Sequence, residues 1–234
     1  MNRYDAVTFD MGYTLTYFHP SEEALMLSAY HSVGLHPDPA ALRQARDQVW
    51  REYFAQAAHN TFQPSRARDW ELEEEMTQKI LDRLGFHDPG LVARLLVATE
   101  AIFDTPGVLR AYPEVEGVLQ ALRSRGYRLG VVSNWSWNLE ERIRQAGLDG
   151  YFDVLMPSAC AGCDKPHPMI FQRALQALGV PPARAIHIGD SYEADVIGAR
   201  RAGMEAVWLD RQKVGGHPDC PTIHTLDEVL AILE

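Results

Sequence analysis

Short apolar runs that alternate with helical segments constrain the fold of this chain more than any other feature of its sequence. A buried run at residues 4–10 comes first. After about residue 106, stretches with helical spacing separate four more runs: Arg128–Val132, Phe152–Met156, Ala185–Ile188 and Ala206–Leu209. Strands that are apolar throughout and alternate with helices are typical of a parallel sheet covered on both faces. The sequence therefore predicts an α/β, Rossmann-like three-layer core.

A long helical stretch interrupts this core after its first strand. Apolar residues recur there at three- and four-residue spacing in four segments: Glu22–Val33, Ala40–Ala57, Trp70–Leu84 and Gly90–Phe103. The pattern divides the chain into two units. We expect the α/β core to comprise residues 1–16 and 106–234, and an all-helical insert to occupy residues 17–105.

Composition and charge argue against two classes of partner. The formal net charge of −10 at pH 7 disfavours nonspecific nucleic-acid binding, which needs clustered basic charge. No apolar stretch approaches the roughly 20 residues that span a bilayer, and the first strand-like run begins too early to leave room for a signal peptide. We expect a cytoplasmic protein that binds neither nucleic acid nor membrane, and the sequence leaves its oligomeric state open.

Polar side chains stand where the apolar runs end. In an open parallel sheet, ligands bind outside the carboxyl ends of the strands. Taken singly, a carboxylate after a strand is more often a turn former or a helix cap. Lys165, however, is one of only three lysines in the chain. The residues expected together on this rim are Asp10, Ser133, Asn134, Lys165, Asp190 and Asp195.

Four motifs that contain these residues resemble the haloacid dehalogenase (HAD) superfamily of hydrolases. They are, in chain order, FDMGYTL, VVSN, KPHPMIF and IHIGDSYEAD. The resemblance implies that Asp10 is a nucleophile that forms an aspartyl phosphate. It implies that Ser133 and Asn134 hydrogen-bond the transferring oxygens and that Lys165 pairs with Asp10 and the phosphoryl group. The helical insert resembles the C1-type cap of that superfamily in its position in the chain and in its helical pattern.

The same resemblance implies a magnesium site. Asp10, Asp190 and Asp195 would supply carboxylate oxygens, and the backbone carbonyl of Gly12 would be a further ligand. Mg²⁺ favours carboxylate oxygens together with retained waters and a substrate phosphate. The cation would also screen the repulsion between the nucleophile and a phosphate dianion.

Gly12 is the departure from the family pattern. Most phosphatases of the superfamily carry a second aspartate there, two residues after the nucleophile, and use it as a general acid and base. Such help is worth about 10²–10⁴-fold in rate. Three hypotheses follow: Tyr13, Tyr17 or His19 supplies the proton, the leaving group needs no acid, or the protein has stopped turning over.

We therefore expect a Mg²⁺-dependent phosphoric monoester hydrolase that acts on a small phosphorylated metabolite. Two alternatives stay open. One is a non-catalytic or regulatory protein that binds a phosphorylated ligand. The other is a 2-haloacid dehalogenase, which also lacks the second aspartate but has no use for Mg²⁺. Arg66 and Arg68, expected in a loop between the second and third helices, are the candidate substrate-binding residues of the insert.

Overall fold

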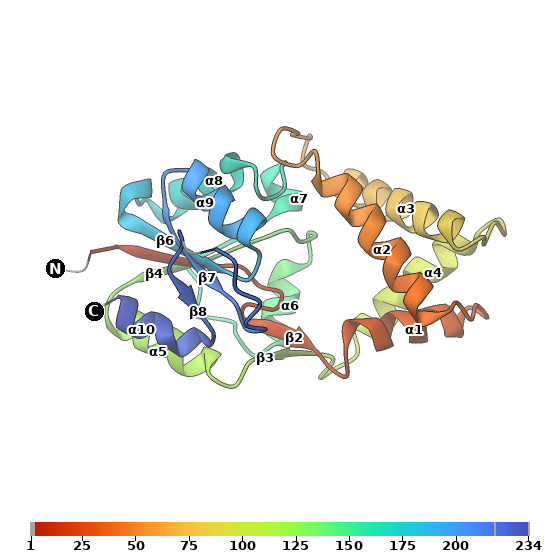
Figure 1. The fold of residues 1–234 in the computed structure, drawn as a ribbon, viewed down its shortest axis with the longest axis horizontal. Coiled ribbons are helices and arrows are strands. Elements are labelled where there is room, and N and C mark those ends of the chain that lie inside the picture. Colours follow the sequence, from red (N-terminus) through yellow and green to blue (C-terminus); the bar gives the residue numbers. More distant parts are fainter. Residues whose placement is uncertain (1–2, 218, 234) are drawn as a thin grey trace.

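The core of the protein is a parallel six-stranded sheet with the order β5-β4-β1-β6-β7-β8 (Figure 1). The computed structural model describes residues 3–217 and 219–233. The central strand β1 pairs with β4 on one side and β6 on the other, so that Phe9 lies opposite both Val131 and Ile188. The strands are β1 (Ala6–Phe9), β4 (Arg128–Ser133), β5 (Val154–Pro157), β6 (Ala185–Gly189), β7 (Glu205–Leu209) and β8 (Thr222–Ile223).

Helices cover both faces of this sheet, as the alternation of side chains along β1 requires. Val7 and Phe9 face one apolar cluster, whereas Ala6 faces the other. The first cluster includes side chains of α5 (Val115–Ser124), α6 (Leu139–Gln145) and α10 (Val229–Ile232). The second includes side chains of α7 (Ser158–Ala161), α8 (Pro168–Leu178) and α9 (Gly198–Arg201). The predicted three-layer α/β core is thus confirmed.

Four further helices lie at the end of the molecule opposite to both chain termini (Figure 1). They share an apolar cluster of their own, with Tyr30, Leu42, Met76 and Leu95 among its buried members. Each buries apolar residues four positions apart, or three and four apart, and so packs through one face. They are α1 (Glu22–Ser32), α2 (Pro39–Phe54), α3 (Arg66–Arg83) and α4 (Leu91–Phe103). Among the described residues, no helix combines the length and apolar character that crossing a membrane requires.

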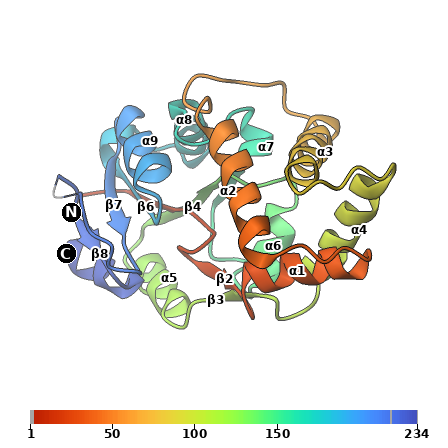
Figure 2. The same ribbon diagram turned by 45° about the vertical axis from the view of Figure 1, so that its right-hand side comes forward.

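Two short antiparallel strands, β2 (Thr16–Phe18) and β3 (Leu109–Ala111), connect the sheet to these helices (Figure 2). The sequence analysis did not predict these strands, because three residues are too few for a periodic signal. The start of α3 also differs from the prediction. The Ser65 hydroxyl accepts a hydrogen bond from the Arg68 backbone at 3.0 Å, so the helix begins at Arg66 and not near Trp70.

Candidate active site

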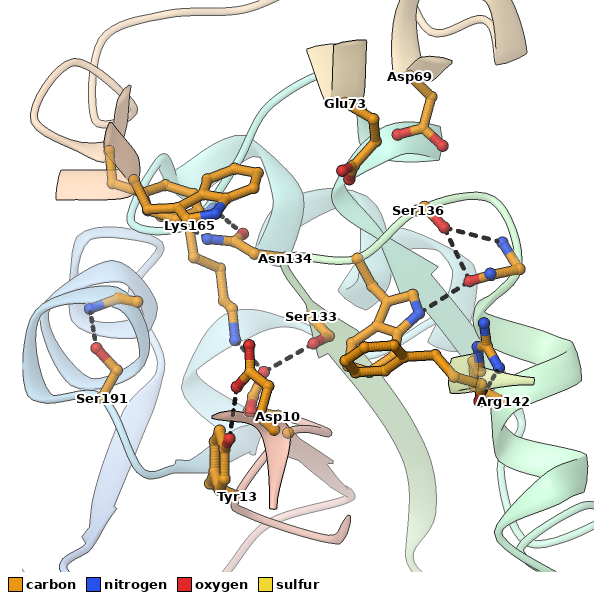
Figure 3. A pocket seen from close by; sticks show the side chains of 18 of the residues that line it. Asp10, Tyr13, Asp69, Glu73, Ser133, Asn134, Ser136, Arg142, Lys165 and Ser191 are labelled. Carbon is orange, nitrogen blue, oxygen red and sulfur yellow. Dashed lines mark hydrogen bonds and ion pairs between the residues drawn. The ribbon is translucent and has the colours of Figure 1, made fainter. Parts of the chain in front are cut away.

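Asp10 directly follows β1 and is held by two side chains from other strand ends. Nζ of Lys165 donates to Oδ1 of Asp10 at 2.6 Å, and the Ser133 hydroxyl donates to the same oxygen at 2.9 Å. Figure 3 shows these three side chains converging at the base of a cavity. Asp10 and Lys165 are only 7% and 3% exposed, so the pair is shielded from bulk water. Three of the residues predicted on this rim, Asp10, Ser133 and Lys165, therefore form one buried cluster.

Two more carboxylates complete the cluster. Asp190 follows β6, and Asp195 lies in a π-helical turn at Tyr192–Ile197. Lys165 also donates to Oδ1 of Asp195 at 2.6 Å. Single oxygen atoms of Asp10, Asp190 and Asp195 all lie within 4.8 Å of one another.

The charges in this cluster do not balance. Burial, followed by the carboxylates of Asp10 and Asp195, raises the pKa of Asp190 to about 8. Burial alone would also raise the pKa of Asp195, but Lys165 and His187 hold it well below its usual range. The Thr14 hydroxyl donates to Oδ1 of Asp190 at a long 3.4 Å.

Three carboxylates facing one ammonium group fit a divalent cation. If all three are ionised, two negative charges remain unmatched, and buried unpaired charge is costly. Oxygen donors of this kind are those that Mg²⁺ prefers. The donor set therefore suits the metal that the sequence predicts.

Asn134 fixes the loop that carries Lys165. Its Oδ1 accepts from the Lys165 backbone N–H at 2.7 Å, and its Nδ2 donates to the Lys165 carbonyl at 3.1 Å. These two hydrogen bonds position the lysine, and Asn134 also lines the cavity above Asp10. Its role as a substrate ligand stays a prediction.

Three residues were predicted as substitutes for the missing acid near Gly12. The Tyr13 hydroxyl donates to Glu22 at 2.6 Å, and burial together with that carboxylate raises the pKa of Tyr13 far above its ordinary value. Tyr17 packs against the ring of Tyr112, and His19 is exposed. Of the three, Tyr13 lines the cavity, and its proton is directed at Glu22.

A cavity of about 930 Å³ lies above Asp10, between the core and the helices α1–α4. Arg66 lines it, whereas Arg68 lines a separate hollow of about 20 Å³. Both arginines lie in the first turn of α3, not in a loop. Two residues along a helix correspond to a rotation of about 200°, which turns Arg68 away from the cavity.

Sequence reasoning missed several residues of this site. His187 is fully buried in β6, with Nε2 3.2 Å from Oδ1 of Asp195 and Nδ1 2.9 Å from the Thr8 hydroxyl. A polar residue inside the apolar run AIHIG was the available signal. Glu73 lines the cavity opposite Asp10, one turn along α3 from Asp69 (Figure 3). That helix carries many exposed acids, so the sequence does not single Glu73 out.

Comparison with known proteins gives a consistent family. Residues 4–203 match the family described as haloacid dehalogenase-like hydrolase. "Haloacid dehalogenase-like hydrolase domain-containing protein 3" of Homo sapiens is 32% identical over 202 residues, which are 86% of this chain and 79% of that protein. The phosphoserine phosphatase of Thermus thermophilus is 36% identical over 149 residues, 63% of this chain and 57% of the relative.

The chain is also similar to a solved structure. The HAD phosphatase from Thermococcus onnurineus has a TM-score of 0.67 and 25% identity, with 98% of this chain and 97% of that chain covered. The share of a relative's length that this chain matches differs from one relative to another. The Bos taurus protein with the same name as the human one is matched over 53% of its length, so the chain spans about half the length of some relatives that it matches.

Proposed function

This chain belongs to the family of haloacid dehalogenase-like hydrolases, and from that premise we propose that it is a Mg²⁺-dependent phosphatase of small phosphorylated metabolites. The observation that carries the proposal is the cluster of Asp10, Lys165 and Ser133 beside two further carboxylates. Relatives named phosphoserine phosphatase and glyceraldehyde 3-phosphate phosphatase support the same reaction class.

Asp10 is the proposed nucleophile. Ser133 and Lys165 both donate to Oδ1 of its carboxylate, which leaves Oδ2 to attack. Oδ2 forms a bond to phosphorus while the ester P–O bond breaks, and the leaving oxygen departs with the bonding electrons. Water then hydrolyses the aspartyl phosphate, which releases inorganic phosphate and restores the carboxylate.

Lys165 and Ser133 have supporting roles in this proposal. Burial raises the pKa of Asp10, and Lys165 opposes that rise. Lys165 also offsets the negative charge of an arriving phosphoryl group. Ser133 fixes the rotamer of Asp10. A Mg²⁺ ion held by Asp10, Asp190, Asp195 and the Gly12 carbonyl would supply charge neutralisation when bound. The proposal treats residues 17–105 as a cap over this site.

Gly12 sets the proposed leaving-group preference. No acid stands at that position, and the Tyr13 proton is directed at Glu22. An alkyl ester, whose leaving oxygen needs a proton, should therefore react slowly. Aryl and acyl phosphates, which leave as weaker bases, should react faster.

Position 12 has space for a side chain, so the leaving-group preference can be tested by restoring an aspartate there. A Cβ at position 12 would lie 3.7 Å from Cζ3 of Trp135, an ordinary contact. We expect Gly12→Asp to raise turnover of alkyl phosphates more than that of aryl phosphates, within the range of about 10²–10⁴-fold for general acid catalysis. Asp10→Asn should abolish turnover of both.

The deciding experiment measures hydrolysis of aryl, acyl and alkyl phosphates by wild type, Asp10→Asn and Gly12→Asp proteins, with and without Mg²⁺. Halide release from 2-haloacids is followed in parallel. Turnover that requires Mg²⁺ and Asp10 supports the proposal. Halide release without Mg²⁺ would favour a dehalogenase, and ligand binding without any turnover would favour a non-catalytic protein.

A further inference from the structure

The wall of the cavity opposite Asp10 carries more negative charge than its surroundings balance. Among the cavity-lining residues of α1–α4, four are acidic and one, Arg66, is basic. Glu22 is neutralised by an ion pair with Arg46. Asp69, Glu73 and Glu100 remain, and none of them forms an ion pair with another described residue.

Figure 3 shows the carboxylates of Asp69 and Glu73 on the side of the cavity opposite Asp10. They are four residues apart on α3, so they lie on the same face of the helix. Asp69 accepts one weak hydrogen bond, from the Trp137 backbone at 3.3 Å. Glu73 forms no hydrogen bond with another described residue, and its side chain is partly exposed where it lines the cavity. Its carboxylate is therefore available to a cationic group that enters the cavity.

Aromatic rings surround these acids. Eight lining residues are aromatic, and four of the five tryptophans of the chain are among them. Tryptophan faces attract cations more strongly than other rings do, and the guanidinium of Arg66 already lies 5.4 Å from the ring of Trp137. The Trp137 Nε1 donor is buried and has no partner among the described residues. The cavity thus offers aromatic faces, two of them the tryptophans Trp50 and Trp70 of α1–α4, beside the acids of the wall.

We propose that this wall recognises an ammonium group on the leaving part of the substrate, joined to the phosphate through an aromatic or similarly apolar segment. Asp69 and Glu73 would pair with the ammonium, and the tryptophan faces would pack against the apolar segment. This inference rests on the proposed phosphatase function, since it places the phosphate at Asp10. It names Glu73 and Asp69 as specificity-determining residues.

A matched pair of compounds tests the inference. In 4-(2-aminoethyl)phenyl phosphate and 4-propylphenyl phosphate, the ammonium group of the first replaces a methyl group, while both leave as similar phenoxides. We expect the kcat/KM of wild type for the ammonium compound to exceed that for the neutral one by about tenfold, which corresponds to about 1.4 kcal/mol. In Glu73→Gln this ratio should fall toward one.

Glu71→Gln is the matched control variant, because Glu71 lies on the same helix, is exposed and does not line the cavity. It should keep the wild-type ratio. Equal kcat/KM values for the two compounds in wild type, or an unchanged ratio in Glu73→Gln, would overturn the inference while leaving a phosphatase in place.

A binding measurement separates this inference from the proposed function. Calorimetric titration of Asp10→Asn with both compounds, in the presence of Mg²⁺, does not depend on turnover. Tighter binding of the ammonium compound supports recognition by the wall even if wild type hydrolyses neither. Equal affinities would contradict it even if both are hydrolysed.

Discussion

At the scale of single residues, the charge balance of the buried cluster depends on Lys165. Its ammonium group is 2.6 Å from oxygens of both Asp10 and Asp195, and it is the one cation in that group of charges. Breaking a buried ion pair by removing one partner costs about 3–5 kcal/mol, because the remaining charge stays buried. We expect Lys165→Met to lower the free energy of unfolding by this amount in EDTA, measured by urea denaturation.

Lys79→Met is the matched control for that experiment. Lys79 forms an exposed pair with Glu75 one turn away, and such pairs contribute about 0.3–0.5 kcal/mol. If the two lysine variants lose similar stability, the cluster does not rely on Lys165 for charge balance.

Glu73 gives a prediction about pH. Burial, and then the neighbouring Asp69 carboxylate, raises the pKa of Glu73 from an ordinary 4.5 to about 7, against the opposing effect of Arg46. The folded protein therefore holds this proton more tightly than the unfolded chain. The stability that follows is complete below pH 4.5 and is lost as the pH rises through 7.

Glu73→Gln has no such proton to lose. We expect its Tm relative to wild type to increase steadily between pH 5 and pH 8, as measured by calorimetry at several pH values. Glu71→Gln should show a constant difference from wild type over the same range. A constant difference for Glu73→Gln would mean that the carboxylate is well solvated in the folded protein.

At the scale of elements, the end of β6 and the turn that follows it approach each other too closely for a side chain. A Cβ at Gly189 would lie 2.1 Å from Cγ of Asp195. Gly189→Ala must therefore push the turn away from the strand and move Asp195 out of the cluster. We expect a loss of roughly 1–3 kcal/mol of stability from the overpacking, together with weaker Mg²⁺ binding in a calorimetric titration.

Gly117→Ala is the opposite case. Gly117 lies inside α5, is exposed, and nothing stands within 4 Å of the position of its Cβ. The same substitution there should raise stability by about 0.5–1 kcal/mol, because glycine is unfavourable in a helix interior. Destabilisation by both changes would show that the effect at Gly189 is not steric.

The elements also show how far a sequence can predict this molecule. The strand ends placed Asp10, Ser133, Lys165 and Asp190 on one rim because parallel strands finish on the same side of their sheet. The first turn of α3 was not predicted. Serine is a common helix N-cap, but Ser65 lies in a polar stretch that is typical of a loop. That error put Arg66 and Arg68 in a loop and concealed that only one of them lines the cavity.

Residues that act across elements were the hardest to predict. Asn134 engages the backbone of Lys165, which is 31 positions away, and His187 bridges Thr8 and Asp195. These contacts depend on which strands are neighbours and not on local periodicity. The cavity acids on α3 require the placement of the helical insert over the sheet, which no spacing in the sequence specifies.

At the scale of the whole molecule, the apolar clusters hold the helices in place, and the cavity contains the candidate active site. Two clusters fasten helices to the faces of the sheet, and a third holds α1–α4 together. Contacts between these helices and the core include polar ones, such as the Tyr53 hydroxyl donating to Asp164 at 2.7 Å. The carboxylate cluster lies where β1 and β6 end, so a cation there would join strands that the chain brings together from far apart.

Magnesium should therefore stabilise the folded protein as a whole. At a hundredfold excess over its Kd, a ligand that binds only the folded state contributes about 2.7 kcal/mol, which for a chain of this size raises Tm by about 5–10 °C. Asp190→Asn removes one of the mutually repelling carboxylates. We expect this variant to melt above wild type in EDTA and to gain little from Mg²⁺.

Differential scanning calorimetry of wild type and Asp190→Asn, with Mg²⁺ or with NaCl at equal ionic strength, measures both effects together. Asp149→Asn removes an exposed carboxylate far along the chain from the cluster and should follow wild type in every condition. If Mg²⁺ raises the Tm of Asp190→Asn as much as that of wild type, Asp190 is not a ligand. If Asp190→Asn melts below wild type in EDTA, the buried carboxylates do not repel one another, and the charge argument for a cation at this site fails.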